Sequence, residues 1–205
     1  MQWGTLGNGS GQFSSPIGIA TAPNGDVYVA DMDNARVEKF TPSGTYLGQL
    51  GSYGTGPGQL QMPIYVATDK DGNVLVWDAS NRVEMFNSSG AFLNQWGSTG
   101  TGPGQFNYGM DALAVDRIGN VYVTDSVNDR VQVFNESGQF LTQWGSQGSS
   151  SGEFVEPQGI AVGSDGDVYV TDFGNARVQV FVDFLTTPNQ VHVPIVFDNA
   201  SAAAP

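Results

Sequence analysis

Acidic and basic side chains recur at a fixed spacing, and they are the first candidates for chemistry in this chain. Four aspartates stand 47 residues apart, and an arginine follows each of them after four or five residues (Asp31, Asp78, Asp125 and Asp172, with Arg36, Arg82, Arg130 and Arg177). A carboxylate beside a guanidinium can bind a charged ligand or can form a charge-assisted hydrogen bond within the fold. Because the pair occurs once in every repeat, we interpret it as architectural and predict that each arginine contacts carboxylate or backbone carbonyl oxygens.

The residue inventory offers little to catalysis. His192 is the only histidine, and the chain has no cysteine. A histidine-based triad, a site with several histidine ligands, a thiolate metal site and a cysteine nucleophile are therefore all excluded. Residues 148–152 match the G-x-S-x-G nucleophile pattern, but no strand–turn–helix context surrounds them. Paired carboxylates such as Asp31 and Asp33 are interpreted as solvated loop charges. We predict a protein that is not an enzyme and that needs no cofactor or metal.

Asparagines in Asn-x-Ser/Thr sequons form a second group of candidate sites, at Asn8, Asn87, Asn135 and Asn199. Asn87 and Asn135 occupy the same position in two successive repeats, directly after the phenylalanine that ends a predicted strand. An exposed tight turn there would accept a glycan in a secreted protein. The alternative is that asparagine and serine are ordinary turn formers. We expect Asn87 and Asn135 to be exposed and glycosylated if the protein is secreted.

The net charge of the chain limits the classes of partner that it can bind. Twenty acidic residues oppose seven basic ones, giving a net charge of −13. Binding to nucleic acid or to an anionic membrane depends on lysine and arginine, so we expect no nucleic-acid partner, and an anionic membrane surface is disfavoured. No apolar run approaches the ~18 residues that would cross a bilayer, so we expect no membrane insertion. The low lysine content and abundant uncharged polar residues favour an extracellular or cell-surface location, although no signal peptide is visible at the N-terminus.

The elements that position these residues follow from an internal repeat. Each unit of about 47 residues contains a short apolar strand, a β-branched and aromatic strand, an alternating strand and a fourth strand, as in Ile17 to Ala20, Val27 to Val29, Arg36 to Phe40 and Tyr46 to Leu50. Glycine and proline turns separate these strands, and no segment has helical periodicity. Four-stranded units at this period are typical of β-propeller blades.

The repeated motifs resemble the NHL repeat. They include Pro-x-Gly-Ile-Ala, Gly-x-Val-Tyr-Val-x-Asp, Asn-x-Arg-Val and Phe-Leu-x-x-Trp-Gly, and they recur four times over residues 1–181. The resemblance implies an all-β protein built as a β-propeller of four-stranded antiparallel blades. About four NHL-type blades are present, so the propeller is either closed or part of a larger or open one. Members of this family are often binding platforms, and some related propellers are metal-dependent lyases or hydrolases.

The last part of the chain departs from the repeat. In the first three units the next aromatic residue lies six positions after the third-strand phenylalanine, but Phe184 lies only three positions after Phe181. We therefore divide the chain into a propeller, residues 1–184, and a C-terminal tail, residues 185–205. The tail contains a strand-like run with Val191, Val193, Ile195, Val196 and Phe197. Because the closing hairpin is missing, we expect this run to pair with the sheet edge of a neighbouring molecule rather than with its own blade.

Three functions are compatible with these residues. The first is a structural scaffold outside the cell that self-associates through its chain ends, because exposed sheet edges recruit other chains. Head-to-tail association of this kind can build a filament. The second is a protein- or ligand-binding module that uses loop aromatics such as Tyr53, Tyr65 and Tyr108. The third, ranked last, is a lyase-like or hydrolase-like propeller. The size distribution of the particle distinguishes the first two functions.

Overall fold

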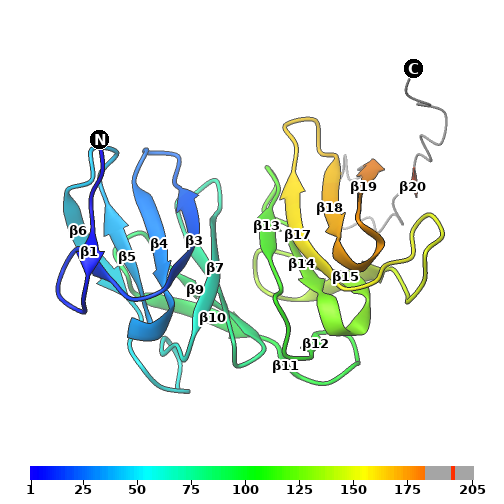
Figure 1. The fold of residues 1–205 in the computed structure, drawn as a ribbon, viewed down its shortest axis with the longest axis horizontal. Coiled ribbons are helices and arrows are strands. Elements are labelled where there is room, and N and C mark those ends of the chain that lie inside the picture. The colour runs from blue at the N-terminus through cyan, green and yellow to red at the C-terminus, as the bar shows by residue number, and fades with distance from the viewer. Residues whose placement is uncertain (183–194, 197–205) are drawn as a thin grey trace.

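Four antiparallel four-stranded sheets make up the computed structural model, which describes residues 1–182 and 195–196 (Figure 1). Each sheet is one blade. Blade 1 contains β3 (Pro16–Thr21), β4 (Val27–Asp31), β5 (Arg36–Phe40) and β6 (Tyr46–Leu50), and blade 2 contains β7 (Pro63–Thr68), β8 (Val74–Asp78), β9 (Arg82–Phe86) and β10 (Phe92–Trp96). Blade 3 contains β13 (Leu113–Val115), β14 (Val121–Asp125), β15 (Arg130–Phe134) and β16 (Phe140–Trp144), and blade 4 contains β17 (Pro157–Val162), β18 (Val168–Asp172), β19 (Arg177–Val182) and β20 (Ile195–Val196). The predicted propeller blades and their period of 47 residues are confirmed.

Short elements occupy the connections. Parallel two-residue strands pair in two of the linkers that precede a blade, β1 (Thr5–Leu6) with β2 (Gln12–Phe13) and β11 (Ser98–Thr99) with β12 (Gln105–Phe106). Single parallel bridges do the same in the other two linkers, Tyr53 to Leu60 and Gln147 to Phe154. One 3₁₀ turn follows the second strand of three blades, η1 (Met32–Asn34), η2 (Ser126–Asn128) and η3 (Phe173–Asn175). Blade 2 has no such turn, which agrees with the shorter spacing from Asp78 to Arg82.

The three largest hydrophobic cores lie between the blades, and a smaller cluster of Val27, Val29 and Phe40 lies on blade 1 alone. One cluster joins Tyr28 and Val37 of blade 1 to Val66 and Phe86 of blade 2. A second joins blades 2 and 3, and a third joins blades 3 and 4. Most apolar side chains of a blade are therefore buried against a neighbouring blade, because a sheet has two faces to cover.

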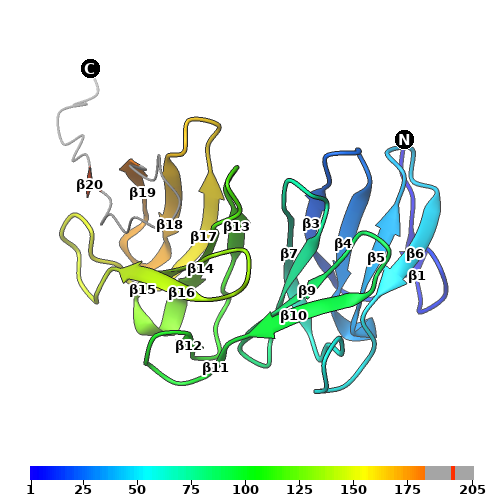
Figure 2. The same cartoon turned by 180° about the vertical axis from the view of Figure 1, so that it is seen from behind.

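The inner strands stand side by side in chain order, with β3 against β7, β7 against β13 and β13 against β17. Gly18 permits the closest of these approaches, because a Cβ at this position would lie 2.5 Å from the carbonyl oxygen of Ile64. Blades 1 and 4 stand on opposite sides of the molecule in both ribbon views (Figures 1 and 2). No helix within the described residues is long and apolar enough to span a membrane.

Blade 4 is completed differently from the expectation. Ile195 and Val196 pair antiparallel with Val182 and Phe181 of the same chain, so the expected pairing with a neighbouring molecule is wrong for these two residues. The β19 edge offers unpaired backbone groups, and a long connection can return the chain to this edge without a tight hairpin at small entropic cost. The predicted tail therefore contributes a strand to the propeller, whereas Val191, Val193 and Phe197 lie outside the described residues.

Candidate functional site: the repeated ion pairs and the two end faces

The repeated Asp–Arg pair fastens each blade to the linker that precedes it. In blade 3, Arg130 Nε donates to Asp125 Oδ2 at 2.7 Å, and its other guanidinium nitrogens donate to the carbonyl oxygens of Thr101, Gly102 and Gln105. Both side chains are buried. A planar guanidinium with five donors suits this role, because it satisfies several carbonyl groups of an irregular loop at once.

Blades 1 and 4 repeat this arrangement, and blade 2 varies it. Arg36 contacts Asp31 at 2.9 Å, and Arg177 contacts Asp172 at 2.7 Å. In blade 2 the shorter loop places Arg82 Nε 2.9 Å from Glu84 instead of Asp78. Asp78 accepts from the backbone N–H groups of Gln61 and Ser80. All four arginines thus hold linker backbone in place, and those of blades 1 to 3 are buried.

A second repeated position holds a carboxylate in two blades and an amide in the other two. Glu38 and Glu84 occupy the place that Gln132 and Gln179 occupy in blades 3 and 4, and all four side chains are buried. Each accepts a hydrogen bond from a linker glycine, as Gly58 N donates to Glu84 and Gly104 N donates to Gln132. Burial raises the pKa of Glu84 to about 7, against the opposing effects of the Gly58 hydrogen bond and Arg82. The pKa of Glu38 is also raised by burial.

The sequons lie in differing surroundings. Asn8 is exposed, whereas Asn87 and Asn135, which we expected to be exposed, are half-buried. Their Oδ1 atoms accept from backbone N–H groups within the same turn, at 3.0 Å from Ser89 and from Ser137. This turn geometry agrees with the alternative role of asparagine as a turn former. Asn199 lies outside the described residues.

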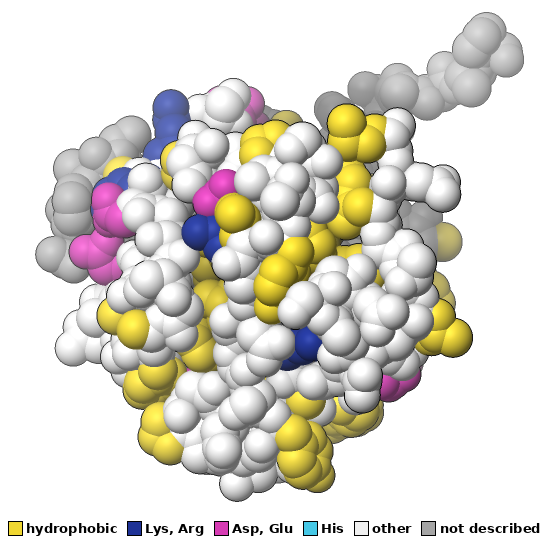
Figure 3. Space-filling model, turned by 90° about the vertical axis from the view of Figure 1, so that its left-hand side faces the viewer, with side chains coloured by type: hydrophobic (Ala, Val, Ile, Leu, Met, Phe, Trp, Pro, Cys, Tyr) yellow, Lys and Arg dark blue, Asp and Glu magenta, His cyan; other side chains and the backbone are white. Residues whose placement is uncertain are grey.

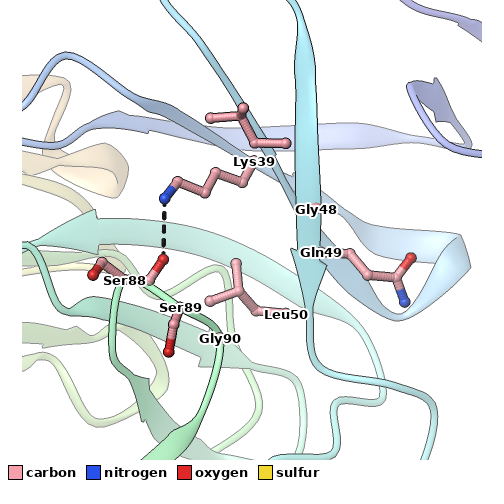
Figure 4. Close-up of a pocket in the computed structure, with 8 residues that line it drawn as sticks. Lys39, Gly48, Gln49, Leu50, Ser88, Ser89 and Gly90 are labelled. Carbon is pink, nitrogen blue, oxygen red and sulfur yellow. Dashed lines mark hydrogen bonds between the residues drawn. The ribbon is translucent and has the colours of Figure 1, made fainter.

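An open groove of about 330 Å³ lies beside the turn that carries Asn87 (Figure 4). Lys39 of β5 reaches across it and donates to the carbonyl oxygen of Ser88 at 3.0 Å, as the dashed line shows. Leu50, Ser89 and Gly90 complete its labelled wall, and Gln49 points away from it. The groove offers an amine, hydroxyls and backbone groups. It separates the outer strands of blade 1 from the next blade.

Asp111 is a buried carboxyl that sequence reasoning did not single out. It replaces the isoleucine found at the same position in blades 1 and 2, and it is fully buried. Its Oδ1 accepts from Ser126 N at 2.7 Å, while Oδ2 has no partner among the described residues. Burial raises the pKa of Asp111 to about 7, opposed by the hydrogen bonds from Ser126. A groove of about 320 Å³ lined by Gly109, Met110 and Ser126 lies next to it.

The raised pKa of Asp111 predicts that the protein loses stability as the pH rises. The folded protein keeps this proton up to about pH 7, whereas the unfolded chain releases it near the usual value of 3.8. The folded state therefore binds more protons between these values, and its free energy of unfolding falls from about pH 4 to about pH 7. We expect Asp111→Asn to reduce this fall, and to be more stable relative to the parent at pH 8 than at pH 5.

Urea unfolding of both proteins at pH 5 and pH 8 measures the effect. The matched control is Asp71→Asn, because Asp71 is an exposed carboxylate. An Asp111→Asn variant whose stability follows the same pH dependence as the parent would contradict the assignment.

The outward face of blade 4 exposes side chains that the other blades bury. Tyr169 of β18 is 39% exposed, whereas its counterparts Tyr28 and Tyr122 are at most 2% exposed. Val178 of β19 is 59% exposed, whereas its counterpart Val131 is fully buried. The physical reason is that blades 1 to 3 each pack this face against the next blade. We call Tyr169, Thr171 and Val178 the blade 4 end face.

Blade 1 exposes part of the opposite face, although Val27, Val29 and Phe40 on that face stay buried. Ile19 of β3 is 64% exposed, whereas its counterparts Val66 and Leu113 are 6% exposed because a preceding blade covers them. Ile17 and Trp3 are also partly exposed on this blade. We call Trp3, Ile17 and Ile19 the blade 1 end face. Seen from the blade 1 side, the molecule presents hydrophobic side chains among uncharged polar surface with few charged groups between them (Figure 3).

The sequence indicates which residues of different blades correspond, but it does not predict which blades have an exposed end face. The period of 47 residues relates Tyr169 to Tyr122 and Ile19 to Val66, but it does not say which copy lacks a neighbour. No group of three or more acidic, histidine or cysteine side chains within the described part of the chain is placed to hold a metal ion. His192 lies outside that part.

Comparisons with known proteins identify the repeat. The family model described as the NHL repeat matches residues 13–40 and 154–181. No relative is found among curated proteins. The blades are similar to a solved streptogramin B lyase, with a TM-score of 0.65 at 14% identity over 83% of this chain and 52% of that one.

Two further solved structures share the fold. One is virginiamycin B lyase from Staphylococcus aureus in a catalytically inactive form with quinupristin, with a TM-score of 0.62 at 15% identity over 90% of this chain and 59% of that one. The other is a protein of unknown function from Bacteroides caccae, with a TM-score of 0.58 at 17% identity over 88% of this chain and 60% of that one. The chain thus spans between half and three fifths of these structures. Two segments of the chain thus match the NHL repeat, and its four blades share the β-propeller fold of these solved structures.

Proposed function

We propose that this chain is a non-catalytic assembly module whose blade 4 end face docks on the blade 1 end face of another copy. The observation that carries the proposal is the exposure of Tyr169, Val178 and Ile19, whose counterparts are buried between blades. Burying one side chain of this size contributes about 1.5–3 kcal/mol, so leaving several exposed is costly in water. Contiguous apolar patches of this kind are typical of interaction surfaces.

A second copy fits these faces because the chain already contains three junctions of the same kind. In each junction the Tyr169-type face of one blade packs on the Ile19-type face of the next, as Tyr122 packs with Val168 and Val170. A blade 4 to blade 1 contact between copies would repeat that packing. Such a contact is heterologous, so it produces a closed ring or a filament according to the angle between successive copies.

Self-association is expected to depend on both end faces. Ile19→Asp would place a charge in the contact on one side, and Val178→Asp would do so on the other, and an unpaired buried charge is strongly unfavourable. We expect each variant to sediment as a monomer at concentrations where the parent forms larger species. An equimolar mixture of the two should form a dimer that grows no further, because one intact face remains on each chain.

The control is Ile118→Asp, since Ile118 is 45% exposed but lies in the β13–β14 hairpin away from both end faces. This variant should associate as the parent does. Analytical ultracentrifugation over a wide concentration range measures all five samples: the parent, the two end-face variants, their mixture and the control. A parent that stays monomeric throughout, or end-face variants that associate normally, would contradict the proposal.

An extracellular or cell-surface location with glycans on the sequons belongs to the same proposal. It is supported by the exposure of Asn8 and by the scarcity of lysine. The intact mass of the protein from its source tests the glycans, because a mass equal to that of the bare chain would count against them.

A second candidate function is the capture of a protein or ligand on the face that carries the 3₁₀ turns. Tyr108 and Met110 are 62% and 49% exposed there, beside the groove next to Asp111. Phe173 of η3 is 62% exposed as well. A parent chain that is monomeric at every concentration would favour this function over assembly.

A further inference from the structure

Among the described residues, part of the edge of β19 lacks the cover that the third strand of every other blade receives. The first valine of that strand pairs with the last residue of the fourth strand, as Val37 pairs with Leu50, Val83 with Trp96 and Val131 with Trp144. All three valines are fully buried. Within the described residues β20 pairs only with Phe181 and Val182, and Val178 is 59% exposed.

The N-terminal residues occupy the matching position on blade 1. Trp3 packs on Phe40 with ring centroids 6.2 Å apart and an interplanar angle of 45°. Trp96 ends the fourth strand of blade 2 and packs on Phe134 of blade 3 at 6.0 Å and the same angle. Trp3 therefore sits on blade 1 as the last residue of a preceding blade's fourth strand would.

Each of the two tryptophan rings packs beside a glycine of a nearby turn. A Cβ at Gly44 would lie 2.7 Å from the Trp3 ring, and a Cβ at Gly138 would lie 2.5 Å from the Trp96 ring. Both glycines have a positive φ, of +82° and +74°. Trp3 and Trp96 thus occupy equivalent sites, each formed by a phenylalanine ring and a turn glycine with positive φ.

The glutamine before the last residue of the fourth strand extends the correspondence between Trp3 and the end of a fourth strand. Gln49 and Gln143 precede Leu50 and Trp144, and they accept hydrogen bonds from Arg36 and Arg130 at 3.2 and 2.9 Å. Gln2 precedes Trp3 in the same way. The corresponding arginine of blade 4, Arg177, keeps 29% of its side chain exposed, whereas those of the other three blades expose 10% or less.

The aromatic neighbours also correspond. In blade 3, Tyr122 meets Trp144 edge to face at 6.2 Å. The counterpart of Tyr122 in blade 4 is Tyr169, which is 39% exposed, and Trp3 is 39% exposed as well. Each of these two rings therefore lacks the contact that its counterpart makes.

We propose that Gln2 and Trp3 of one copy add a strand to β19 of a second copy, along the part of its edge around Val178 with which β20 does not pair. In this register Trp3 lies opposite Val178 and against Tyr169, and Gln2 accepts a hydrogen bond from Arg177. The contact is a strand addition, in which backbone hydrogen bonds supply affinity and the side-chain slots supply specificity. The inference rests on the proposed function, because it assumes that blade 4 meets blade 1 of another copy, and it adds the strand and the register through which they meet.

Single cysteines test this register directly, because the chain has none of its own. We would mix Trp3→Cys with Val178→Cys under mild oxidation. Directly opposed residues of an antiparallel pair have Cα atoms about 4.5–5.5 Å apart, a separation that a disulfide spans. We expect a crosslinked heterodimer from this mixture and only background crosslinking when Trp3→Cys is mixed with Ile118→Cys.

The dissociation constant for self-association supplies a second measurement. We expect Trp3→Ala to raise the dissociation constant by about tenfold or more, since a buried aromatic anchor often carries that much of an interface. Self-association that depends on Ile19, but shows neither the specific crosslink nor an effect of Trp3→Ala, would overturn the strand addition and leave the proposed function standing. A parent that never associates would overturn both.

Discussion

Replacing Asp125 by alanine is expected to lower the free energy of unfolding by about 3–5 kcal/mol. The Asp125 carboxylate is fully buried and accepts from Arg130 at 2.7 Å, from Asn128 at 2.9 Å and from Gln132 at 3.1 Å. Its removal leaves a buried guanidinium without its counter-charge and loosens the linker that Arg130 holds. Urea denaturation followed by tryptophan fluorescence measures the loss.

Two comparisons make this prediction specific to a buried pair. Asp71→Ala removes an exposed ion pair with Lys70, and it should change the stability by no more than about 0.5 kcal/mol. Asp172→Ala should cost less than Asp125→Ala, because solvent screens the partly exposed Arg177. Equal losses for Asp71 and Asp125 would refute the structural role assigned to the repeated pairs.

Phe106→Ala is expected to have an effect of similar size, again about 3–5 kcal/mol. Phe106 is fully buried in the linker between blades 2 and 3. Its ring meets Trp77 edge to face at 4.9 Å and packs on Phe134 at 5.9 Å, so it joins the two blades. Removing it leaves a cavity in the core that they share.

The matched control is Phe92→Ala, since Phe92 is 37% exposed at the start of an outer strand. We expect this variant to lose clearly less stability in the same urea measurement. If both variants lost the same amount, the cores would not lie between the blades as described.

The strands could be predicted from the sequence because β-branched residues, turn glycines and the repeat all indicate the same blade. The pairs of Arg36 with Asp31 and of Arg177 with Asp172 followed from their recurrence, since a side chain that returns once per blade serves the blade. The sequence predicted carboxylate or backbone carbonyl partners for the arginines, but not which linker carbonyls accept from them, because every residue carries such an acceptor.

The other differences between the sequence-based expectations and the structure also arise from contacts that a sequence pattern does not reveal. The return of Ile195 and Val196 to their own blade depends on a long-range pairing that no turn motif announces. The end faces depend on which blades have neighbours, and Tyr169 has the same sequence surroundings as Tyr122. Asp111 stands in an irregular insertion of blade 3, where the repeat gives no guide to burial.

The placement of the cores between blades also determines how the molecule opens. Blades 2 and 3 each share two cores with neighbours, whereas blades 1 and 4 each share one with another blade. In such a linear array stability is close to a sum of nearest-neighbour terms, so an outer blade can detach while the inner pair stays packed. Unfolding should accordingly proceed by fraying from both ends, and a copy docked at one end would suppress fraying there.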